Sequence, residues 1–317
     1  MPDSRRGVLF GAAAYTMWGL FPLYWPLLRP TGAVEILAHR IAWSLVVVLG
    51  VLLVRRHWSW IRTIVRRPRT LLLLTLAAMA VTVNWGLYIY AVNSGHVVES
   101  SLGYFINPLV NVLFGVLVFR ERMRRWQWVA VGLGALAVVV LSVDYGRPPW
   151  IALVLAASFG TYGLLKKSAG VGAAESLAVE TLVLLGPALG YLLVLEFQGA
   201  GTFAGYGVWH AVLLAGAGLV TAVPLMMFTA AAIRVPLTVL GLLQYIAPIL
   251  QFLCGVLVAR EVMPMSRWVG FAVIWAALAV FSWDSLRHTR AARRRAARPA
   301  EPVAPLGRVP QPERSAT

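Results

Sequence analysis

Three ionisable side chains, His39, Arg40 and Glu180, lie inside apolar stretches that are long enough to cross a membrane. A charge at the centre of a bilayer costs roughly 3 kcal/mol or more unless it faces a cavity or a partner. Such residues therefore indicate a polar pathway or a binding pocket rather than an apolar core. The alternative is that these side chains reach the membrane surface from the ends of their helices.

Arg40 and Glu180 occupy equivalent positions of an internal repeat and carry opposite charges. One lies about six residues, or roughly 9 Å, from the outer face of a hydrocarbon core about 30 Å thick, and the other lies equally far from the inner face. The two charges therefore differ by about 12 Å in depth. This separation disfavours a direct ion pair. We predict that Arg40 meets a solute or a local partner near the outer mouth, and that Glu180 does so near the inner mouth.

Polar side chains follow one face of two further apolar stretches. Tyr104, Asn107 and Asn111 have the i, i+3, i+7 spacing of a helix face, and the same offsets lead to Gln244 and Gln251 in the repeat. Amide groups at these positions can line a solute pocket, or they can bond neighbouring helices to each other. We favour the pocket, and interhelical bonding is the alternative.

A proline accompanies each polar stripe, Pro108 in the first and Pro248 in the second. Proline removes a backbone hydrogen bond and crowds the carbonyl four residues earlier, here that of Tyr104 or Gln244. Interrupted membrane helices with freed carbonyls are typical of transporter binding sites. We predict that both prolines break their helices.

Aromatic and amide residues in two other stretches could complete a pocket for an organic molecule. Asn84 and Tyr88 lie one turn apart beside Trp85, and Tyr15 and Trp18 share a face near the N-terminus. Aromatic rings suit apolar and cation–π contacts with a ligand, although packing explains the two tryptophans equally well. The candidate substrate-binding residues are Tyr15, Trp18, His39, Arg40, Asn84, Trp85, Tyr88, Tyr104, Asn107, Asn111, Glu180, Gln244, Tyr245 and Gln251.

These residues must be positioned by membrane-spanning helices, because the composition excludes a water-soluble domain. Of the 317 residues, 60% are hydrophobic, and the mean hydropathy is +0.76. Apolar windows of roughly 17 to 23 residues have the length needed to cross a bilayer. They predict ten spans at approximately residues 7–28, 34–54, 71–92, 101–119, 126–143, 150–165, 177–195, 210–233, 238–258 and 267–283.

The spans fall into two sets of five, because Leu102–Glu121 aligns without a gap on Leu242–Glu261 with 10 of 20 residues identical. An odd number of spans in each set makes the second set enter the membrane from the opposite side. We predict an all-α membrane protein with ten transmembrane helices in two inverted five-helix repeats around a central cavity. The first repeat covers residues 7–143 and the second covers residues 150–283.

Basic residues predict the orientation of the chain. With a cytoplasmic N-terminus, the inner segments before the tail carry 15 Lys and Arg and the outer loops carry 4, which places both termini in the cytoplasm. We interpret the first span as a membrane helix, since it is too long for a cleavable signal peptide. Residues 285–317 are rich in Arg, Ala and Pro, and we predict a disordered basic tail that can lie on anionic lipid headgroups.

Three residues have simpler structural explanations. Glu35 and Glu175 lie in the first turn of their helices, where a carboxylate stabilises the positive end of the helix dipole. Glu35 can instead pair with His39, four residues later. Cys254 is the only cysteine, which excludes an intramolecular disulfide and a thiolate metal site, so we expect it to be a packing residue.

Three segments resemble a known family: AHRIAWS (38–44), SLGYFINPLVN (101–111) and FTAAAIRVPLTVLGLLQYIAP (228–248). They are similar to the RarD group of EamA transporters, in the drug/metabolite transporter (DMT) superfamily, and the resemblance covers residues 5–284. It implies two inverted EamA repeats, a central cavity and solute export or exchange at the bacterial cytoplasmic membrane. Similar proteins carry a chloramphenicol-sensitivity label. The arginine-rich tail departs from the compact family pattern.

The predicted function is secondary transport of a small organic solute, such as an amino acid, a metabolite or a drug like chloramphenicol, by alternating access. A membrane-embedded enzyme and a non-transporting scaffold are the alternatives. The sequence has no GxSxG and no HExxH motif, so we predict no enzyme activity and no catalytic residue. It has no Walker motif either, which leaves a proton or a counter-solute to drive transport.

We expect the solute and membrane lipid to be the partners of this protein, with homodimer formation left open. The net charge of +16 does not indicate nucleic-acid binding, because the basic residues follow the membrane topology. No cofactor and no metal site are predicted.

Overall fold

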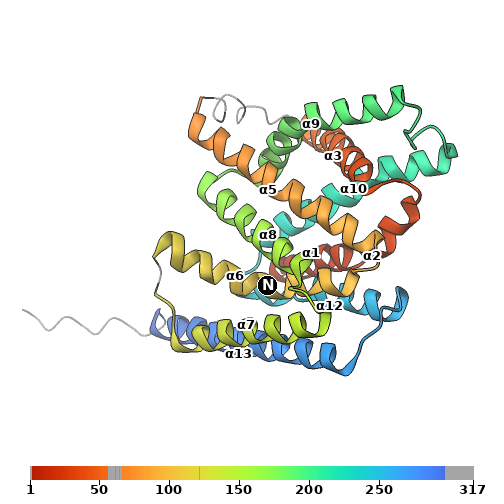
Figure 1. Cartoon of the computed structure of the whole chain (residues 1–317). Coiled ribbons are helices and arrows are strands. Elements are labelled where there is room, and N and C mark those ends of the chain that lie inside the picture. The colour runs from red at the N-terminus through yellow and green to blue at the C-terminus, as the bar shows by residue number, and fades with distance from the viewer. Residues whose placement is uncertain (1, 56–60, 62–63, 65, 121, 297–317) are drawn as a thin grey trace, which may run out of the picture.

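The computed structural model describes residues 2–296 except 56–60, 62–63, 65 and 121 (Figure 1). This part of the chain is helical and contains no strand. The helices are α1 (Pro2–Gly19), α2 (Phe21–Tyr24), η1 (Trp25–Leu28), α3 (Ala33–Arg55), α5 (Pro68–Asn93), α6 (Val97–Phe119), α7 (Arg125–Tyr145), α8 (Trp150–Ala169), α9 (Ala173–Phe197), α10 (Gly207–Ala232), α11 (Leu237–Leu243), α12 (Ile246–Leu253), η2 (Cys254–Val258) and α13 (Met265–Ala296).

These elements make ten membrane crossings, because α2 and η1 continue α1, and because α11, α12 and η2 form one interrupted span. Eight helical segments of the described residues are long and apolar enough to cross a membrane by themselves. The other two crossings are the α1–η1 segment, which is divided after Gly19, and α8. Lys166 and Lys167 in the last turn of α8 lower its hydropathy.

The helices pair in the pattern that two inverted repeats produce. Equivalent helices of the two halves pack on each other, as α7 does on α13, α3 on α9 and α6 on α12. The other main contacts occur in equivalent pairs: α5 with α8 corresponds to α10 with α1, and α6 with α8 corresponds to α12 with α1. Figure 1 shows α7 and α13 along one edge of the molecule and α3 and α9 along the opposite edge. This confirms the predicted all-α fold.

Glycines allow the closest helix contacts. A Cβ atom on Gly103 of α6 would lie 2.7 Å from the carbonyl oxygen of Ala152 in α8, and one on Gly218 of α10 would lie 2.4 Å from the backbone of Trp43 in α3. Small residues at such crossings allow helix backbones to approach in lipid, where no hydrophobic effect drives helices together. These two contacts hold the helices that carry the candidate site.

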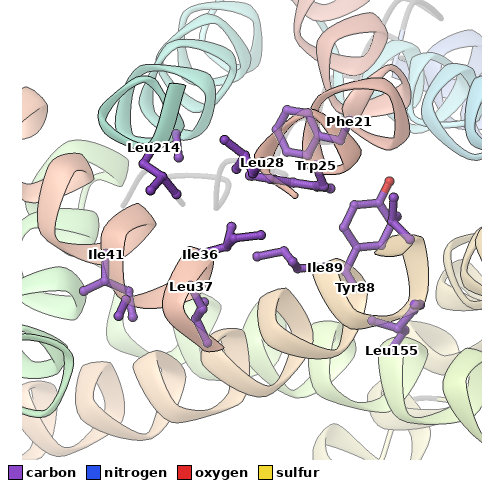
Figure 2. Close-up of a cluster of buried hydrophobic side chains, with 14 of the residues drawn as sticks. Phe21, Trp25, Leu28, Ile36, Leu37, Ile41, Tyr88, Ile89, Leu155 and Leu214 are labelled. Atoms are coloured by element: carbon purple, nitrogen blue, oxygen red, sulfur yellow. The ribbon is translucent and has the colours of Figure 1, made fainter. Parts of the chain in front are cut away.

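The main buried cluster lies where η1, α3, α5, α8 and α10 meet. It contains Trp25, Ile36, Tyr88, Ile89 and Leu155 (Figure 2). In Figure 2 the hydroxyl of Tyr88 points toward the segment that carries Phe21 and Trp25, so a polar group enters an otherwise apolar core.

The two repeated prolines have different effects. Helix α6 runs without interruption through Pro108, so the prediction that this proline breaks its helix is wrong. Membrane helices tolerate proline where neighbouring helices support the backbone. The span of Pro248 is interrupted, since α11 ends at Leu243 and α12 begins at Ile246. The interruption includes Gln244, whose carbonyl the proline crowds.

The C-terminal helix is longer than predicted. Helix α13 continues to Ala296, so the disorder expected from Ser285 is wrong for residues 285–296. Arg and Ala are good helix formers. The membrane-spanning part of α13 is already helical, so residues 285–296 can extend the helix without a new nucleation step. The remaining tail, residues 297–317, lies outside the described residues.

Candidate functional site

A polar cavity of about 340 Å³ lies between α6, α7, α13 and the interruption of the α11–α12 span. Asn111 and Gln244, one from each polar stripe, line it together with Pro108. The connection between α6 and α7 adds Arg122 and Arg124. A cavity of this size, with amide groups from both repeats and guanidinium groups from the first, can hold a small polar organic molecule.

Arg40 of α3 is buried, with 3% of its surface exposed. Its Cζ atom lies 3.9 Å from the ring centroid of Trp85 and 5.2 Å from that of Trp25. Its Nε donates a hydrogen bond of 2.7 Å to Oγ1 of Thr221 in α10. Nη1 is buried without a hydrogen-bond partner. Arg40 is therefore a membrane-embedded cation held by aromatic faces and one hydroxyl.

Glu180 of α9 has a separate set of partners and is completely buried. Ser176 Oγ and Tyr162 Oη donate to its carboxylate at 2.5 and 3.1 Å, and Lys166 Nζ lies 3.2 Å from Oε1. Lys166 also donates to the hydroxyl of Tyr162 at 2.8 Å. Among the described residues Glu180 is thus paired with Lys166 and not with Arg40. The roles of Arg40 and Glu180 toward a solute stay a prediction.

Asn84, Tyr88 and Tyr104 form an amide and aromatic cluster between α5, α6 and α8. Asn84 Nδ2 donates to the carbonyl of Leu155 at 3.0 Å, and the hydroxyl of Tyr104 donates to Asn84 Oδ1 at 3.1 Å. The rings of Tyr88 and Tyr104 meet edge to face, with centroids 5.6 Å apart. The hydroxyl of Tyr88 is buried without a partner. Asn84 therefore bonds α5 to both α6 and α8.

Tyr15 and Trp18 of α1 form a second aromatic group with Phe228 of α10, with ring centroids 5.4 to 6.0 Å apart. Gln251 Nε2 donates to the carbonyl of Trp18 at 3.2 Å. The carbonyl oxygens of the Gln251 and Asn107 side chains are buried without partners. Gln251 therefore links helices with one end of its amide and leaves the other end unsatisfied.

Two candidates lie away from these groups. His39 stacks on Phe203, in the connection between α9 and α10, with ring centroids 4.9 Å apart. Tyr245 accepts a hydrogen bond of 3.3 Å from Ser282 in α13. The structure thus brings Arg40, Trp85 and the Asn84 cluster into the protein interior, and it places Asn111 and Gln244 on the cavity. It does not bring all the predicted residues into one pocket.

Three carboxylates close the end of the molecule opposite the cavity. Glu35 accepts hydrogen bonds from the backbone N–H and hydroxyl of Thr202, at 2.7 and 3.0 Å. Glu35 therefore binds the connection between α9 and α10 instead of His39. Its repeat equivalent Glu175 lies close to Gly172, the N-cap residue of α9, as expected for a residue of the first turn.

The other two carboxylates, Glu99 and Glu261, were missed in the sequence. Glu99 pairs with Arg147 at 2.8 Å and accepts from the N–H of Ile151, and this bonding raises the pKa of the Arg147 guanidinium. Glu261 accepts from the N–H groups of Val97 and Val98 at the start of α6. Burial raises the pKa of the Glu261 carboxyl, against the effect of these bonds. The sequence did offer one indication for Glu261, because the pair Arg260-Glu261 repeats the pair Arg120-Glu121.

A further pair of carboxylates ties α7 to α13 at both ends. Asp144 binds Arg267 Nε at 2.9 Å, and Asp284 binds Arg124 Nη2 at 2.7 Å. The two aspartates are repeat equivalents, which the sequence alignment could have revealed. In the described part of the chain, no three His, Cys, Asp or Glu side chains are grouped to hold a metal ion.

Comparisons with known proteins agree on one family. The EamA-like transporter family matches residues 5–143. Protein RarD of Streptomyces exfoliatus is 62% identical over 293 residues, which cover 92% of this chain and 93% of that protein. Uncharacterized transporter YojE of Bacillus subtilis is 44% identical, covering 92% and 98% of the two chains.

A more distant relative is the chloramphenicol-sensitive protein RarD of Pseudomonas aeruginosa, which is 33% identical, covering 93% of this chain and 99% of that protein. A crystal structure with 17% sequence identity superimposes with a TM-score of 0.57 and covers 86% of this chain and 96% of the other. At that identity the match supports the fold alone.

Proposed function

The chain belongs to the EamA-like transporter family, in the RarD group of the drug/metabolite transporter superfamily, and we propose that it moves a small organic solute by alternating access. It is a multi-pass membrane protein, and its bacterial relatives are named as transporters or as RarD proteins. We assign it to the cytoplasmic membrane with both termini inside the cell, in keeping with the bias of basic residues.

The observation that carries the proposal is the cavity lined by Asn111 and Gln244. It opens at the end of the molecule that carries Arg122 and Arg124, which the bias of basic residues assigns to the cytoplasm. The opposite end is closed by hydrogen bonds of Glu35, Glu99 and Glu261. A transporter that is open at its cytoplasmic end and closed at its outer end is in the inward-facing state, one of the two main states of an alternating-access cycle.

We propose an amino acid, a metabolite or an amphenicol drug as the solute, exported or exchanged through the candidate residues named from the sequence. A proton or a counter-solute would drive it, and copies of the chain could pair in the membrane. A membrane-embedded enzyme is the less favoured function, because the cavity lining contains amides, guanidinium groups and apolar side chains but no nucleophile with a base.

The proposal can be tested with purified protein in proteoliposomes, where uptake of radiolabelled amino acids, aromatic metabolites and chloramphenicol is measured. Asn111→Ala and Gln244→Ala should each raise the KM about fivefold to tenfold, because one pocket hydrogen bond contributes about 1 kcal/mol. Thermal stability should stay near that of the unsubstituted protein, since these side chains face a cavity.

The matched control is Gln198→Ala, which removes an exposed amide after α9 and should leave the KM unchanged. Loss of thermal stability with normal transport in the two cavity variants would show that the amides serve helix packing. Absence of transport for the whole panel would contradict the proposed function.

A further inference from the structure

Among the residues that the structure describes, Arg40 is a cation of the membrane interior whose charge is not compensated by a carboxylate. Arg40 is buried among Trp85, Trp25 and Phe21, and no carboxylate forms an ion pair with it in the part of the chain that the structure describes. Its one hydrogen bond is to Thr221. A buried charge without a partner is strongly unfavourable, which makes a missing counter-charge the simplest explanation.

The buried carboxylates of the neighbouring helices are already used. Glu180 of α9 binds Lys166, and Glu35 of α3 binds Thr202. Glu99 of α6 binds Arg147. None of the three buried glutamates of these helices, in the described part of the chain, is therefore left to neutralise Arg40.

The geometry around Arg40 defines the chemistry of an occupant. The Cζ atom of its guanidinium lies over the ring of Trp85, 3.9 Å from the ring centroid, and Nη1 has no acceptor. A planar guanidinium edge matches the two oxygens of a carboxylate. Tyr88, in the same core cluster as Trp25, also has a hydroxyl without a partner and could donate to such an oxygen. The aromatic walls suit an apolar body.

We propose that the transported solute is an organic carboxylate with an apolar or aromatic body, and that its carboxylate binds Arg40 within the membrane. This inference rests on the proposed transport function. It adds the charge class of the solute, and it gives a reason for an arginine at a depth where lipid disfavours charge. Arg122 and Arg124, which line the cavity, favour the approach of an anion to the cavity itself.

The first test compares ligands that share an apolar body and carry a negative, neutral or positive polar group. The melting temperature of the purified protein is measured with phenylacetate, phenylacetamide and phenethylamine, and with hexanoate and hexanamide. Sodium chloride, sodium sulfate and phosphatidylglycerol micelles are the other additions. We expect a concentration-dependent rise with a carboxylate that exceeds the rise with its amide, because binding to the folded state alone stabilises it.

Equal rises for carboxylate and amide, a larger rise with the amine, or no rise with any carboxylate would overturn the proposal. A rise with chloride, sulfate or phosphatidylglycerol that organic carboxylates do not exceed would assign an inorganic anion or a lipid headgroup to Arg40, and would overturn it as well. This comparison uses the unsubstituted protein, so it does not depend on the folding of any variant.

The second test substitutes the arginine. Arg40→Gln should lower the affinity for the stabilising carboxylate about 10- to 100-fold, because hydrogen bonds to charged groups are among the stronger ones. Arg40→Lys should be intermediate, since it keeps the charge but loses the planar edge. Arg29→Gln removes an exposed arginine at the end of η1 and should have no effect.

The outcomes separate this inference from the proposed function. Transport of neutral or cationic solutes that Arg40→Gln leaves unchanged would retain the transport function and reject the carboxylate. Failure of every solute to be transported would reject the function itself, whatever the melting experiments show.

Discussion

Single buried residues show most clearly how the chain places charge in lipid. Arg40 and Glu180 are repeat equivalents of opposite sign, and each has its own neighbours. Glu180 is satisfied within the chain by Lys166, Tyr162 and Ser176, whereas Arg40 has aromatic faces and one hydroxyl. The charge of Glu180 is therefore compensated within the chain, whereas Arg40 lacks an anionic partner among the described residues.

A double-mutant cycle tests these partnerships. Glu180→Gln and Lys166→Met should show a coupling of about 1–3 kcal/mol in the free energy of unfolding, because the two side chains share an ion pair and the hydroxyl of Tyr162. The cycle of Glu180→Gln with Arg40→Gln is the control and should be additive within about 0.5 kcal/mol. A larger coupling to Arg40 than to Lys166 would show that the arginine and the glutamate form the true pair.

Residue types were easier to predict than residue partners. The charge of Arg40 in an apolar stretch identified it, but its contacts with Trp25 and Thr221 depend on how helices far apart in sequence cross. Asn84 stays a predicted pocket residue, and the structure shows that it also bonds α5 to α8. An amide in a membrane helix gives the same signal whether its partner is a helix or a solute.

At the scale of the helices, the α7–α13 pair is fixed at both ends by equivalent ion pairs. Asp144 binds Arg267 at one end, and Asp284 binds Arg124 at the other. The side chains of both aspartates are buried, Asp144 at the end of α7 and Asp284 within α13, and an unpaired buried carboxylate would be costly. The two pairs differ in one respect, since Arg124 also lines the cavity.

This difference leads to a prediction. Asp144→Asn and Asp284→Asn should each lower the free energy of unfolding by about 1–3 kcal/mol, because a hydrogen-bonded charge pair is broken in each. Only Asp284→Asn should also change the KM for transport, since it releases Arg124 at the cavity. The stability is measured by thermal unfolding, with Glu196→Gln on the exposed end of α9 as the control. A changed KM in Asp144→Asn would contradict the assignment of the cavity.

The number of helices and their division into two inverted repeats followed from the sequence, and helix continuity did not. Apolar length and the repeat alignment predicted ten crossings in two inverted sets, because the bilayer imposes the length of each span. Pro108 and Pro248 have similar local sequences, yet only the second lies in an interrupted span. Each proline removes one backbone hydrogen bond from its helix. Contacts with neighbouring helices then decide whether the helix continues.

The whole molecule combines an open end with a closed one. The closure uses side chains that bind backbone, as Glu261 does with Val97 and Val98 at the start of α6. Sequence patterns do not reveal such contacts, because almost every residue carries the same backbone N–H group and none is marked as the partner. If the solute site is reached from alternate sides, these contacts must break when the outer end opens.

Glu261 therefore should control the balance between the two states, and cysteine labelling can measure it. In a Cys254→Ser background, Asn111→Cys should react with a membrane-impermeant maleimide from the cytoplasmic side only, because Asn111 lines the cavity. Adding Glu261→Gln should slow this reaction up to about tenfold, since the loss of charge-assisted hydrogen bonds worth about 1.5 kcal/mol favours the outward-facing state.

Acid should act in the same direction as Glu261→Gln. Burial raises the pKa of the Glu261 carboxyl, so lowering the pH neutralises this group before exposed carboxyls and removes the charge that its hydrogen bonds require. The labelling rate is corrected for the intrinsic pH dependence of the reacting thiolate, which slows labelling in acid in every variant. The corrected rate should no longer depend on pH in the Gln variant, whereas it should still do so in Glu196→Gln. Labelling of Asn111→Cys from the outside, or a rate that Glu261→Gln leaves unchanged in a well-folded protein, would show that Glu261 does not hold the outer end closed.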